Sequence, residues 1–378
     1  MAEDRESVGE ARPQAVESGL RRVEFNPDMS FHQALHRRVD EHFRSTGRRK
    51  RDCWQMYLKT AIILAVFGTA YTLLVFVATA LWQGLALTVL LALCMAAVGF
   101  NIQHDGGHQA YSERVWVNRL MAWTLDLMGS SSGRWRWMHS VIHHMYVNIT
   151  GYDDDIDLGL LARMSPHQEW RWWHRWQHLY IWLFYGMLAV KWQFVEDFRY
   201  VITGKLGRNR VPRPRGWGVV VFVAGKLLFL AWAFAVPMLL HPAWTVLFYY
   251  AVATLVLSVV LTLVFTIPHL VEKADFPMPR EDTGRLERPW DVHQALVTVN
   301  FAMRNPILTW LLGGLNYHKE HHLFPLICHV NYPRMSGAVE ETCREFGVPY
   351  HAYGSFLAGV AAHYRWLRRM GRSAQARA

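Results

Sequence analysis

Long uncharged stretches of apolar residues dominate the pattern of the sequence. Segments 62–82 and 85–102 carry no charged residue, and only Gln83 and Gly84 separate them. Segments 218–240 and 244–267 are also apolar, with Lys226 as their one charged residue, and the three residues 241–243 connect them. A helix needs about 20 apolar residues to cross a hydrocarbon core of about 30 Å. The pattern therefore predicts an all-α integral membrane protein with four transmembrane helices arranged as two hairpins.

The segment before the first apolar stretch has a different pattern. Phe31, Leu35, Val39 and Phe43 recur every four residues among charged ones, which predicts an amphipathic helix lying on the membrane surface. We therefore expect three parts, namely an N-terminal tail with this helix, a membrane domain and a C-terminal tail, at residues 1–56, 57–369 and 370–378.

Basic residues predict the orientation in the membrane. Segments 48–51 (RRKR) and 208–215 (RNRVPRPR) precede the first and third spans, whereas both hairpin connections lack Lys and Arg. The positive-inside rule then places both termini and segment 103–217, which would form a cap, in the cytoplasm. Segment 170–192 is rich in Trp and cations, so we expect an interfacial helix, with a span interrupted by Lys191 as the alternative.

Composition narrows the classes of partner. The net charge of +10 would suit nucleic acid, but 52% of the residues are hydrophobic, so we expect the lipid bilayer or an acidic protein as partner and no nucleic acid. The four cysteines lie far apart in the sequence, and none forms a C-x-x-C pair. Neither a disulfide framework nor a thiolate metal site is predicted.

Eight of the 20 histidines gather in three short motifs near the predicted cytoplasmic ends of the spans. Residues four apart lie about 40° apart around a helix, so two histidines at that spacing can share a metal ion, whereas a fifth position points about 100° further round. Imidazole suits iron, zinc, copper or nickel. The motifs therefore predict two metal ions without choosing the element. They are HDGGH (His104, His108), HSVIHH (His139, His143, His144) and HKEHH (His318, His321, His322).

These motifs resemble the three histidine boxes of membrane fatty acid desaturases. The resemblance extends roughly from Phe31 to Tyr364 and includes WRWMHSVIHHMYVNITGYDDDID, WDVHQALVTVNF and GLNYHKEHHLFP. These motif sequences are most similar to those of bacterial acyl desaturases. It implies a non-haem centre of two iron ions. A ninth ligand is implied at His269 in TIPHLVE, with His293 as the alternative. Phe265 stands where related animal desaturases have an asparagine.

The resemblance also implies the reaction. An O2-dependent fatty acyl desaturase introduces a cis double bond into an acyl-CoA or acyl-lipid, with no catalytic side chains beyond the iron ligands. The chain has no HPGG motif of a fused cytochrome domain, and it keeps His318 where front-end desaturases usually have glutamine. We therefore expect electrons from a separate protein of the ferredoxin, flavodoxin or cytochrome b5 type.

Three other functions compete with this interpretation. A hydroxylase or ketolase of the same superfamily would share the boxes and differ only in its product. A zinc-dependent membrane hydrolase needs only about three protein ligands per zinc ion, fewer than eight or nine histidines provide. A metal transporter should place polar residues along a path across the bilayer, whereas the first, second and fourth spans carry no charge.

Several polar residues beside the boxes could orient the imidazole rings. The acyl chain should occupy an apolar tunnel between the helices that bends near the metal ions. Lys226, in the third span, is expected to extend to the cytoplasmic interface. The polar candidates for ring orientation are Asp105, Asn148, Asp153, Asp154, Asp155, Asp157, Glu272 and Glu320.

Overall fold

The chain is mostly helical, and the computed structural model describes residues 23–372. Four helices in this part are long and apolar enough to cross a membrane. Two of them contain π-helical turns and continue beyond them. The four are α2 (Trp54–Phe76), α3 (Leu81–Val98) with η1 (Gly99–Gln103) and α4 (His104–Gly107), α12 (Trp217–Leu230) with η6 (Ala231–Ala235) and α13 (Val236–Met238), and α14 (Ala243–Thr266).

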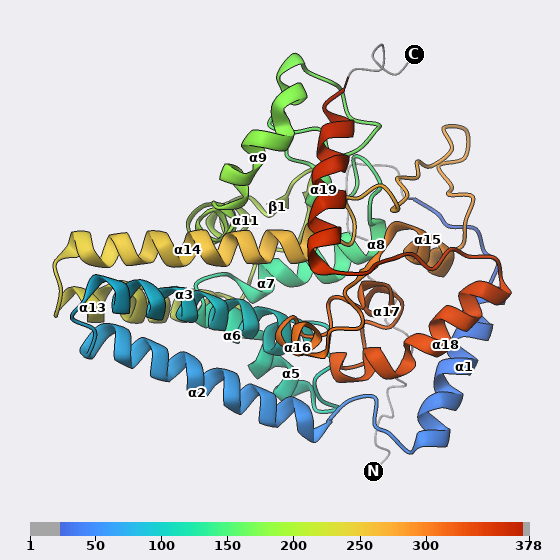
Figure 1. Cartoon of the computed structure of the whole chain (residues 1–378). Helices are drawn as coiled ribbons and strands as arrows, with labels where there is room; N and C mark the ends of the chain where they lie inside the picture. Colours follow the sequence, from blue (N-terminus) through green and yellow to red (C-terminus); the bar gives the residue numbers. More distant parts are fainter. Residues whose placement is uncertain (1–22, 373–378) are drawn as a thin grey trace.

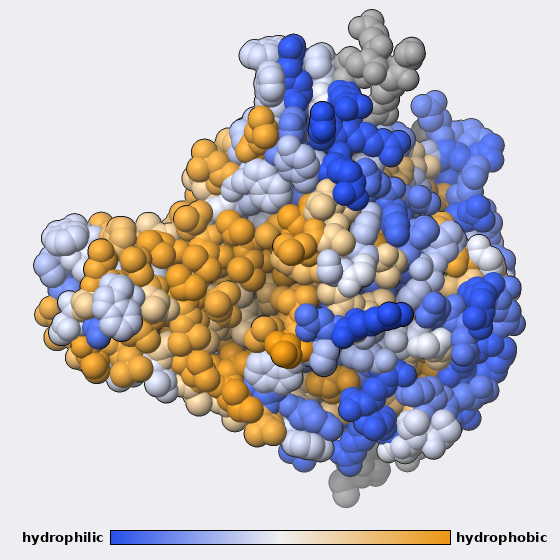
Figure 2. Space-filling model, viewed as in Figure 1, coloured by the Kyte–Doolittle hydropathy of each residue, from blue (hydrophilic) through white to orange (hydrophobic). Residues whose placement is uncertain are grey.

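The helix α3 packs against both α2 and α14, and the long helices extend together to one side of the molecule (Figure 1). Their inner faces form an apolar core that includes Ala92, Val98 and Leu257. Their outer faces expose large apolar side chains such as Leu227, and Figure 2 shows a broad apolar surface over this part of the molecule. Such a surface is typical of a protein embedded in lipid.

The first long helix begins and ends earlier than the sequence predicted. It covers Trp54–Phe76 instead of 62–82, because Lys59 is buried and its Nζ lies 2.9 Å from His329 Nε2, so this charge does not end the helix. The turn falls before Leu81, since the side-chain oxygen of Gln83 accepts the backbone N–H groups of Thr79 and Ala80 at 3.1 Å each. The other three long helices start within four residues of the expected positions.

The amphipathic helix is confirmed as α1 (Ser30–Thr46), but its expected place on the membrane surface is wrong. Phe31, Leu35, Val39 and Phe43 are all buried. They pack with α18 (Tyr332–Glu345) in one apolar cluster, and Figure 1 shows the two helices side by side. An apolar face is covered by whichever surface the fold supplies, and the sequence of α1 does not reveal its partner.

The segment between the second and third long helices consists of short elements. The Trp-rich part predicted as an interfacial helix is divided by a turn at Gly186 and Met187. Neither the nine-residue helix Gln177–Tyr185 before the turn nor the continuous helical run 188–203 after it is long enough to cross a membrane. The elements are α5 (Val115–Ala122), α6 (Thr124–Leu127), α7 (Ser132–Trp135), η2 (Arg136–His143), α8 (His144–Tyr146), η3 (Asp154–Ile156), η4 (Trp172–Trp176), α9 (Gln177–Tyr185), α10 (Leu188–Lys191), η5 (Trp192–Glu196), α11 (Asp197–Thr203), β1 (Lys205–Leu206) and β2 (Asn209–Arg210).

The part of the chain after the fourth long helix folds back over the end of the bundle at which α14 ends. Strand β1 pairs with β2 antiparallel and β3 with β4 parallel, each as a two-residue ladder. No closed sheet is formed within residues 23–372. The elements are α15 (Trp290–Val297), β3 (Asn300–Phe301), α16 (Pro306–Leu311), α17 (His318–Leu323), η7 (His329–Asn331), α18, β4 (Ala352–Tyr353) and α19 (Phe356–Met370).

Lys226 does not extend freely to the interface as the sequence suggested. Its Nζ donates to the backbone oxygens of Gly129 and Gln193 at 2.6 Å each, and it lies 2.8 Å from a carboxylate oxygen of Asp197. Asp197 also pairs with Arg134 at 2.6 Å. This buried ion-pair network ties α12 to the segment that leads into η2, where the second histidine motif begins.

Candidate metal centre

The structure gathers all three histidine motifs at one end of the long helices, which we call the histidine end. The connections 77–80 and 239–242 form the opposite, far end (Figure 1). The histidines come from α4 and the residue that follows it, from η2 and α8, from the turn after α14, and from α17. All nine expected ligands are buried, with at most 7% of their surface exposed. They are His104, His108, His139, His143, His144, His269, His318, His321 and His322.

The imidazole nitrogens of these residues form overlapping groups that could hold metal ions. One group contains the motif pair His104 and His108 together with His139 and His321, with all four ligand atoms within 4.8 Å of one another. A second group, equally close, contains His143, His269 and His322. Between the two, His144 forms a third group with His321 and His322. His318 adjoins the second group, since its Nε2 lies 2.8 Å from His269 Nε2 and 3.2 Å from His322 Nε2.

The hydrogen bonds around this second group leave acceptor nitrogens facing one another. A carbonyl oxygen only accepts, so His269 Nδ1, 3.2 Å from Val297 O, must carry a proton. The same holds for His318 Nδ1, 3.1 Å from Leu315 O. A neutral imidazole has one donor and one acceptor nitrogen, so two lone pairs face each other across the 2.8 Å between the Nε2 atoms. The two lone pairs repel each other unless a cation binds both nitrogens. These two Nε2 atoms are therefore suited to hold a metal ion.

The neighbourhood keeps most of these rings neutral. Burial, followed by the effect of neighbouring imidazoles, holds the pKa of His108, His139 and His321 well below the ordinary value. Burial likewise lowers the pKa of His318 to about 3. Because a metal ion binds the neutral imidazole, these histidines are in the ligating form at neutral pH without losing a proton.

His143 is an exception, because a carboxylate supports its outer nitrogen. Burial acts to lower its pKa, but the charge and hydrogen bond of Asp153 outweigh burial, and the pKa is raised. The Nδ1 atom lies 3.2 Å from Asp153 and 3.4 Å from Asp155. A carboxylate on the outer nitrogen holds the tautomer whose Nε2 faces inward, an arrangement typical of metal-ligating histidines.

The local geometry of the second motif differs from the sequence expectation. On an α-helix His139 and His143 would serve one metal ion and His144 the other. The rings of His139 and His143 stack, with centroids 5.3 Å apart, and a ligand nitrogen of each lies within 4.8 Å of the other in a group with Asp155. Each also belongs to a separate histidine group, His143 with His269 and His139 with His104. The cause is the π-helical conformation of η2, whose wider turn changes the angle between residues. Another π-helical turn, η1, precedes the first motif, and such turns are frequent at functional sites.

The two candidates for the ninth ligand lie in different surroundings. The structure brings His269 into the second group, whereas His293 belongs to none of the histidine groups among the described residues. The ring of His293 packs against Phe25 with centroids 5.3 Å apart. Burial lowers its pKa to about 4, so a strongly lowered histidine pKa also occurs outside the histidine groups.

Of the polar residues expected to orient the imidazole rings, only Asp105 of the first motif, and Asp153 and Asp155 after the second motif, approach histidine rings. Asp153 and Asp155 contact His143, and Asp105 lies 3.0 Å from His329 Nδ1 and 4.0 Å from His104 Nδ1. The others have partners elsewhere. Asn148 bonds the backbone oxygen of His269, Asp154 bonds Asn209, Asp157 caps Gly159, Glu272 pairs with Arg365, and Glu320 bonds Asn300 and Tyr350.

Two residues that contact ring nitrogens were missed by sequence reasoning. The side-chain oxygen of Gln294 lies 3.0 Å from His322 Nδ1, and the hydroxyl of Tyr332 lies 3.3 Å from His321 Nδ1. Apart from its place beside His293, the alternative ninth ligand, nothing in the sequence distinguishes Gln294 from a surface glutamine.

An apolar seam between α3 and α14 leads away from the histidines. A small cavity of about 40 Å³ beside the centre is lined by Gln103, Trp135 and Phe265. The ring of Phe265 lies 6.1 Å from that of His139 between centroids. A second cavity, of about 210 Å³, lies at the far end. Met95 lines both cavities.

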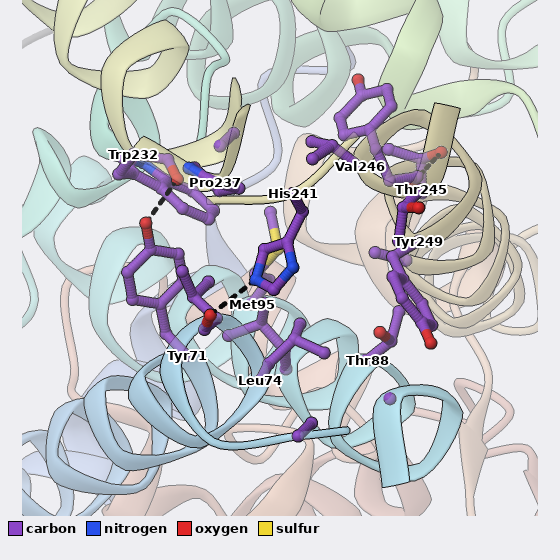
Figure 3. A pocket seen from close by; sticks show the side chains of 18 of the residues that line it. Tyr71, Leu74, Thr88, Met95, Trp232, Pro237, His241, Thr245, Val246 and Tyr249 are labelled. Atoms are coloured by element: carbon purple, nitrogen blue, oxygen red, sulfur yellow. Dashed lines mark hydrogen bonds between the residues drawn. The ribbon is translucent and has the colours of Figure 1, made fainter. Parts of the chain in front are cut away.

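The far cavity is mostly apolar and is closed by a few hydrogen bonds (Figure 3). The hydroxyl of Tyr71 donates to the backbone oxygen of Trp232 at 2.7 Å, and the ring of His241 bonds the backbone oxygen of Val75 at 2.7 Å. These bonds join the two pairs of long helices across the cavity. Below them the cavity extends between α3 and α14 towards Met95.

Known proteins with similar sequences indicate what this centre does. Residues 80–354 match the family model described as fatty acid desaturase. The chain is 37% identical over 350 residues to the sn-1 linoleoyl-lipid 6-desaturase of Arthrospira platensis, a match that covers 92% of this chain and 95% of the relative.

Two further relatives agree. The sn-1 linoleoyl-lipid 6-desaturase of Synechocystis sp. is 35% identical, covering 93% of this chain and 98% of the relative. The acyl-lipid (8-3)-desaturase of Physcomitrium patens is 33% identical, covering 96% and 77%. The family model spans all three histidine motifs and the last three of the four long helices. The chain therefore belongs to the fatty acid desaturase family and is an oxidoreductase of the membrane that acts as an acyl desaturase.

Proposed function

We propose that the chain is an O2-dependent acyl-lipid desaturase that introduces a cis double bond at a centre of two iron ions. The single observation that carries the metal centre is the facing pair of acceptor nitrogens, His269 Nε2 and His318 Nε2, at 2.8 Å. The ligands in this proposal are the eight box histidines and His269. His293, which lies outside the histidine groups, is not proposed as a ligand.

Two iron ions would supply the oxidising chemistry that side chains lack, because removing hydrogen from an unactivated methylene requires activated dioxygen. In the overall reaction one O2, two electrons, two protons and two substrate hydrogens become two water molecules, and the substrate gains a double bond. The protein holds the ligands through Asp153, Gln294 and backbone oxygens, so the imidazoles keep their orientation. The same contacts keep the rings from acting as acids or bases.

An acyl-lipid substrate is supported by the relatives, whose names specify linoleoyl-lipid or acyl-lipid as substrates. The seam between α3 and α14 would take the acyl chain. Gln103 at its inner end and Met95 at its middle are eight residues apart, or about 12 Å along a helix, and Gly84 at its far end is about 28 Å from Gln103. One leaflet of a bilayer spans about 15 Å, so an ordinary acyl chain would end near Met95.

The remaining parts of the proposal concern orientation and electron supply. With two hairpins and the positive-inside rule, both termini, the cap and the active site face the cytoplasm. Electrons come from a separate ferredoxin, flavodoxin or cytochrome b5 with its reductase. Exposed Arg48, Arg49 and Arg334 border a cavity at the histidine end, and a basic surface of this kind attracts an acidic redox protein.

The proposal is tested by expressing the chain with a redox partner in a host that lacks the corresponding unsaturated lipids. Mass spectrometry of each lipid class should show one new cis double bond in lipid-bound chains, and His321→Ala should show none. Metal analysis should give close to two iron ions per chain. Unchanged saturation with an active partner would overturn the proposal, a hydroxylated product would favour the hydroxylase, and one zinc without iron would favour the hydrolase.

A further inference from the structure

Two cysteines that are far apart in the sequence meet at the histidine end of the fold. Cys53 precedes α2, and Cys328 lies in the loop between α17 and η7. Their sulfur atoms are 3.4 Å apart, although 274 residues separate them and the sequence predicted no cysteine pairing. The other two cysteines, Cys94 and Cys343, are buried within α3 and α18.

The backbone holds the two cysteine-bearing segments together without help from the sulfurs. The backbone N–H of Cys328 donates to Lys50 O at 3.0 Å. The side-chain amide of Asn331 donates to Arg49 O at 3.0 Å and to Lys50 O at 3.3 Å. A disulfide requires the sulfurs to approach to about 2 Å. Because the segments already lie side by side, rotation of the two side chains can supply this approach.

The surroundings make Cys53 the more reactive of the two thiols. Its pKa is lowered to about 7, chiefly because Cys328 donates a hydrogen bond to it, with Asn331 and Arg334 acting against the effect of burial. The same hydrogen bond, together with burial, raises the pKa of Cys328. Cys53 is partly exposed and borders a cavity of about 350 Å³ with Arg48 and Arg49. Reactive cysteines are found in such electropositive, partly exposed places.

We propose that Cys53 and Cys328 form a redox-active dithiol that hydrogen peroxide converts into a reversible disulfide. The Cys53 thiolate attacks the peroxide O–O bond and becomes a sulfenic acid, while the other oxygen leaves as hydroxide and takes up a proton to give water. The Cys328 thiol then attacks the Cys53 sulfur and displaces the second oxygen, which leaves as water. In sum, two thiols and one hydrogen peroxide give one disulfide and two water molecules, and an external dithiol restores the thiols.

The position of the pair links this chemistry to the histidine centre. His329, the residue after Cys328, contacts Asp105 through both its backbone N–H and its Nδ1, at 3.0 Å each. Asp105 follows His104 in the first motif. A disulfide would fasten the start of α2 to the loop that carries His329, so peroxide near the centre would be recorded in a covalent bond beside it.

The test uses the full chain in lipid nanodiscs, reduced, freed of reductant and exposed to hydrogen peroxide before alkylation and tryptic digestion. The expected product joins peptide 52–59 (DCWQMYLK) to peptide 320–334 (EHHLFPLICHVNYPR), and dithiothreitol should release it. The rate should rise with pH and reach half of its maximum near pH 7, the pKa of Cys53. Because the readout is a peptide mass, it does not depend on desaturase activity.

Matched variants assign the two roles. In the Cys328→Ser variant, dimedone should trap a sulfenic acid at Cys53. In the Cys53→Ser variant, Cys328 should carry no dimedone and should be recovered as the alkylated thiol. Cys94→Ser and Cys343→Ser should form the linked peptide at the wild-type rate. The proposal is overturned if the wild-type chain yields both cysteine peptides only as alkylated thiols, or if the sulfenic acid forms first at Cys328.

Discussion

The two ends of the long helices hold their contents in opposite ways. At the histidine end, directional contacts orient ring nitrogens, as where Asp153 meets His143 at 3.2 Å and Gln294 meets His322 at 3.0 Å. At the far end, the cavity of Figure 3 is lined mainly by apolar side chains, with hydrogen bonds such as that from Tyr71 only at its margin. One end fixes atoms in direction, and the other limits only the space that they occupy.

From this difference we expect some single substitutions to change the reaction itself and others to change only the choice among acyl substrates. A lost ligand or ring partner changes the metal centre itself, because imidazole coordination is directional. A changed apolar side chain alters volume and leaves the chemistry intact. Substitutions at the histidine end should therefore abolish the reaction, whereas those along the seam should redistribute its substrates.

The largest effect is expected for His321→Ala. His321 belongs both to the group with His104 and to the group with His144, so its loss should disturb both metal positions. Iron per chain should fall to half or less, and product should become undetectable by lipid mass spectrometry. Wild-type activity in this variant would contradict the proposal that the histidine end holds the metal ions.

The pair His269→Ala and His293→Ala sharpens the same point with two buried histidines. Removing His269 should lower iron content and activity at least tenfold, because its Nε2 faces that of His318 at 2.8 Å. Removing His293, whose ring packs on Phe25, should leave iron per folded chain unchanged. Metal analysis of the monodisperse fraction measures both variants, and the reverse pattern would make His293 the ninth ligand.

A smaller loss is expected for Asp153→Asn, which keeps the shape and removes the charge behind His143. Loss of such a partner typically lowers metal affinity by about 10- to 100-fold. Asp157→Asn is the matched control, since Asp157 only caps Gly159. Iron retention against a graded chelator gives the affinities, and equal retention in the two variants would contradict the role assigned to Asp153.

The smallest effect on total activity is expected at Met95, which lines both cavities of the seam. Met95→Trp should lower the share of long-chain product about threefold or more, and Met95→Ala should raise it, because the side chain divides the space along α3. Leu93→Trp changes a residue of the same helix that is 45% exposed on its outer face and should leave the distribution unchanged. Products are measured by chain length in a mixed-substrate assay.

Local patterns in the sequence were enough to predict the four apolar helices and to reveal the three histidine motifs. Four helices of the expected kind are present, and the structure gathers the three motifs at one end. Such features depend on residues within one helix, so hydrophobicity and spacing reveal them without knowledge of the fold. Helix ends were less predictable, because the buried Lys59 and the cap formed by Gln83 override the simple rule that charges end a span.

Contacts between distant segments were decided only by the tertiary structure. The covering of α1 by α18, the inclusion of His269 and exclusion of His293, and the meeting of Cys53 with Cys328 each join residues that are remote in the sequence. The apolar repeat of α1 predicted a covered face but not the helix that covers it, and single residues such as His269 or Cys53 leave no periodic trace. These residues come together only when whole helices and loops pack. The motifs in the sequence therefore revealed the kind of site, whereas the fold decided which side chains form it.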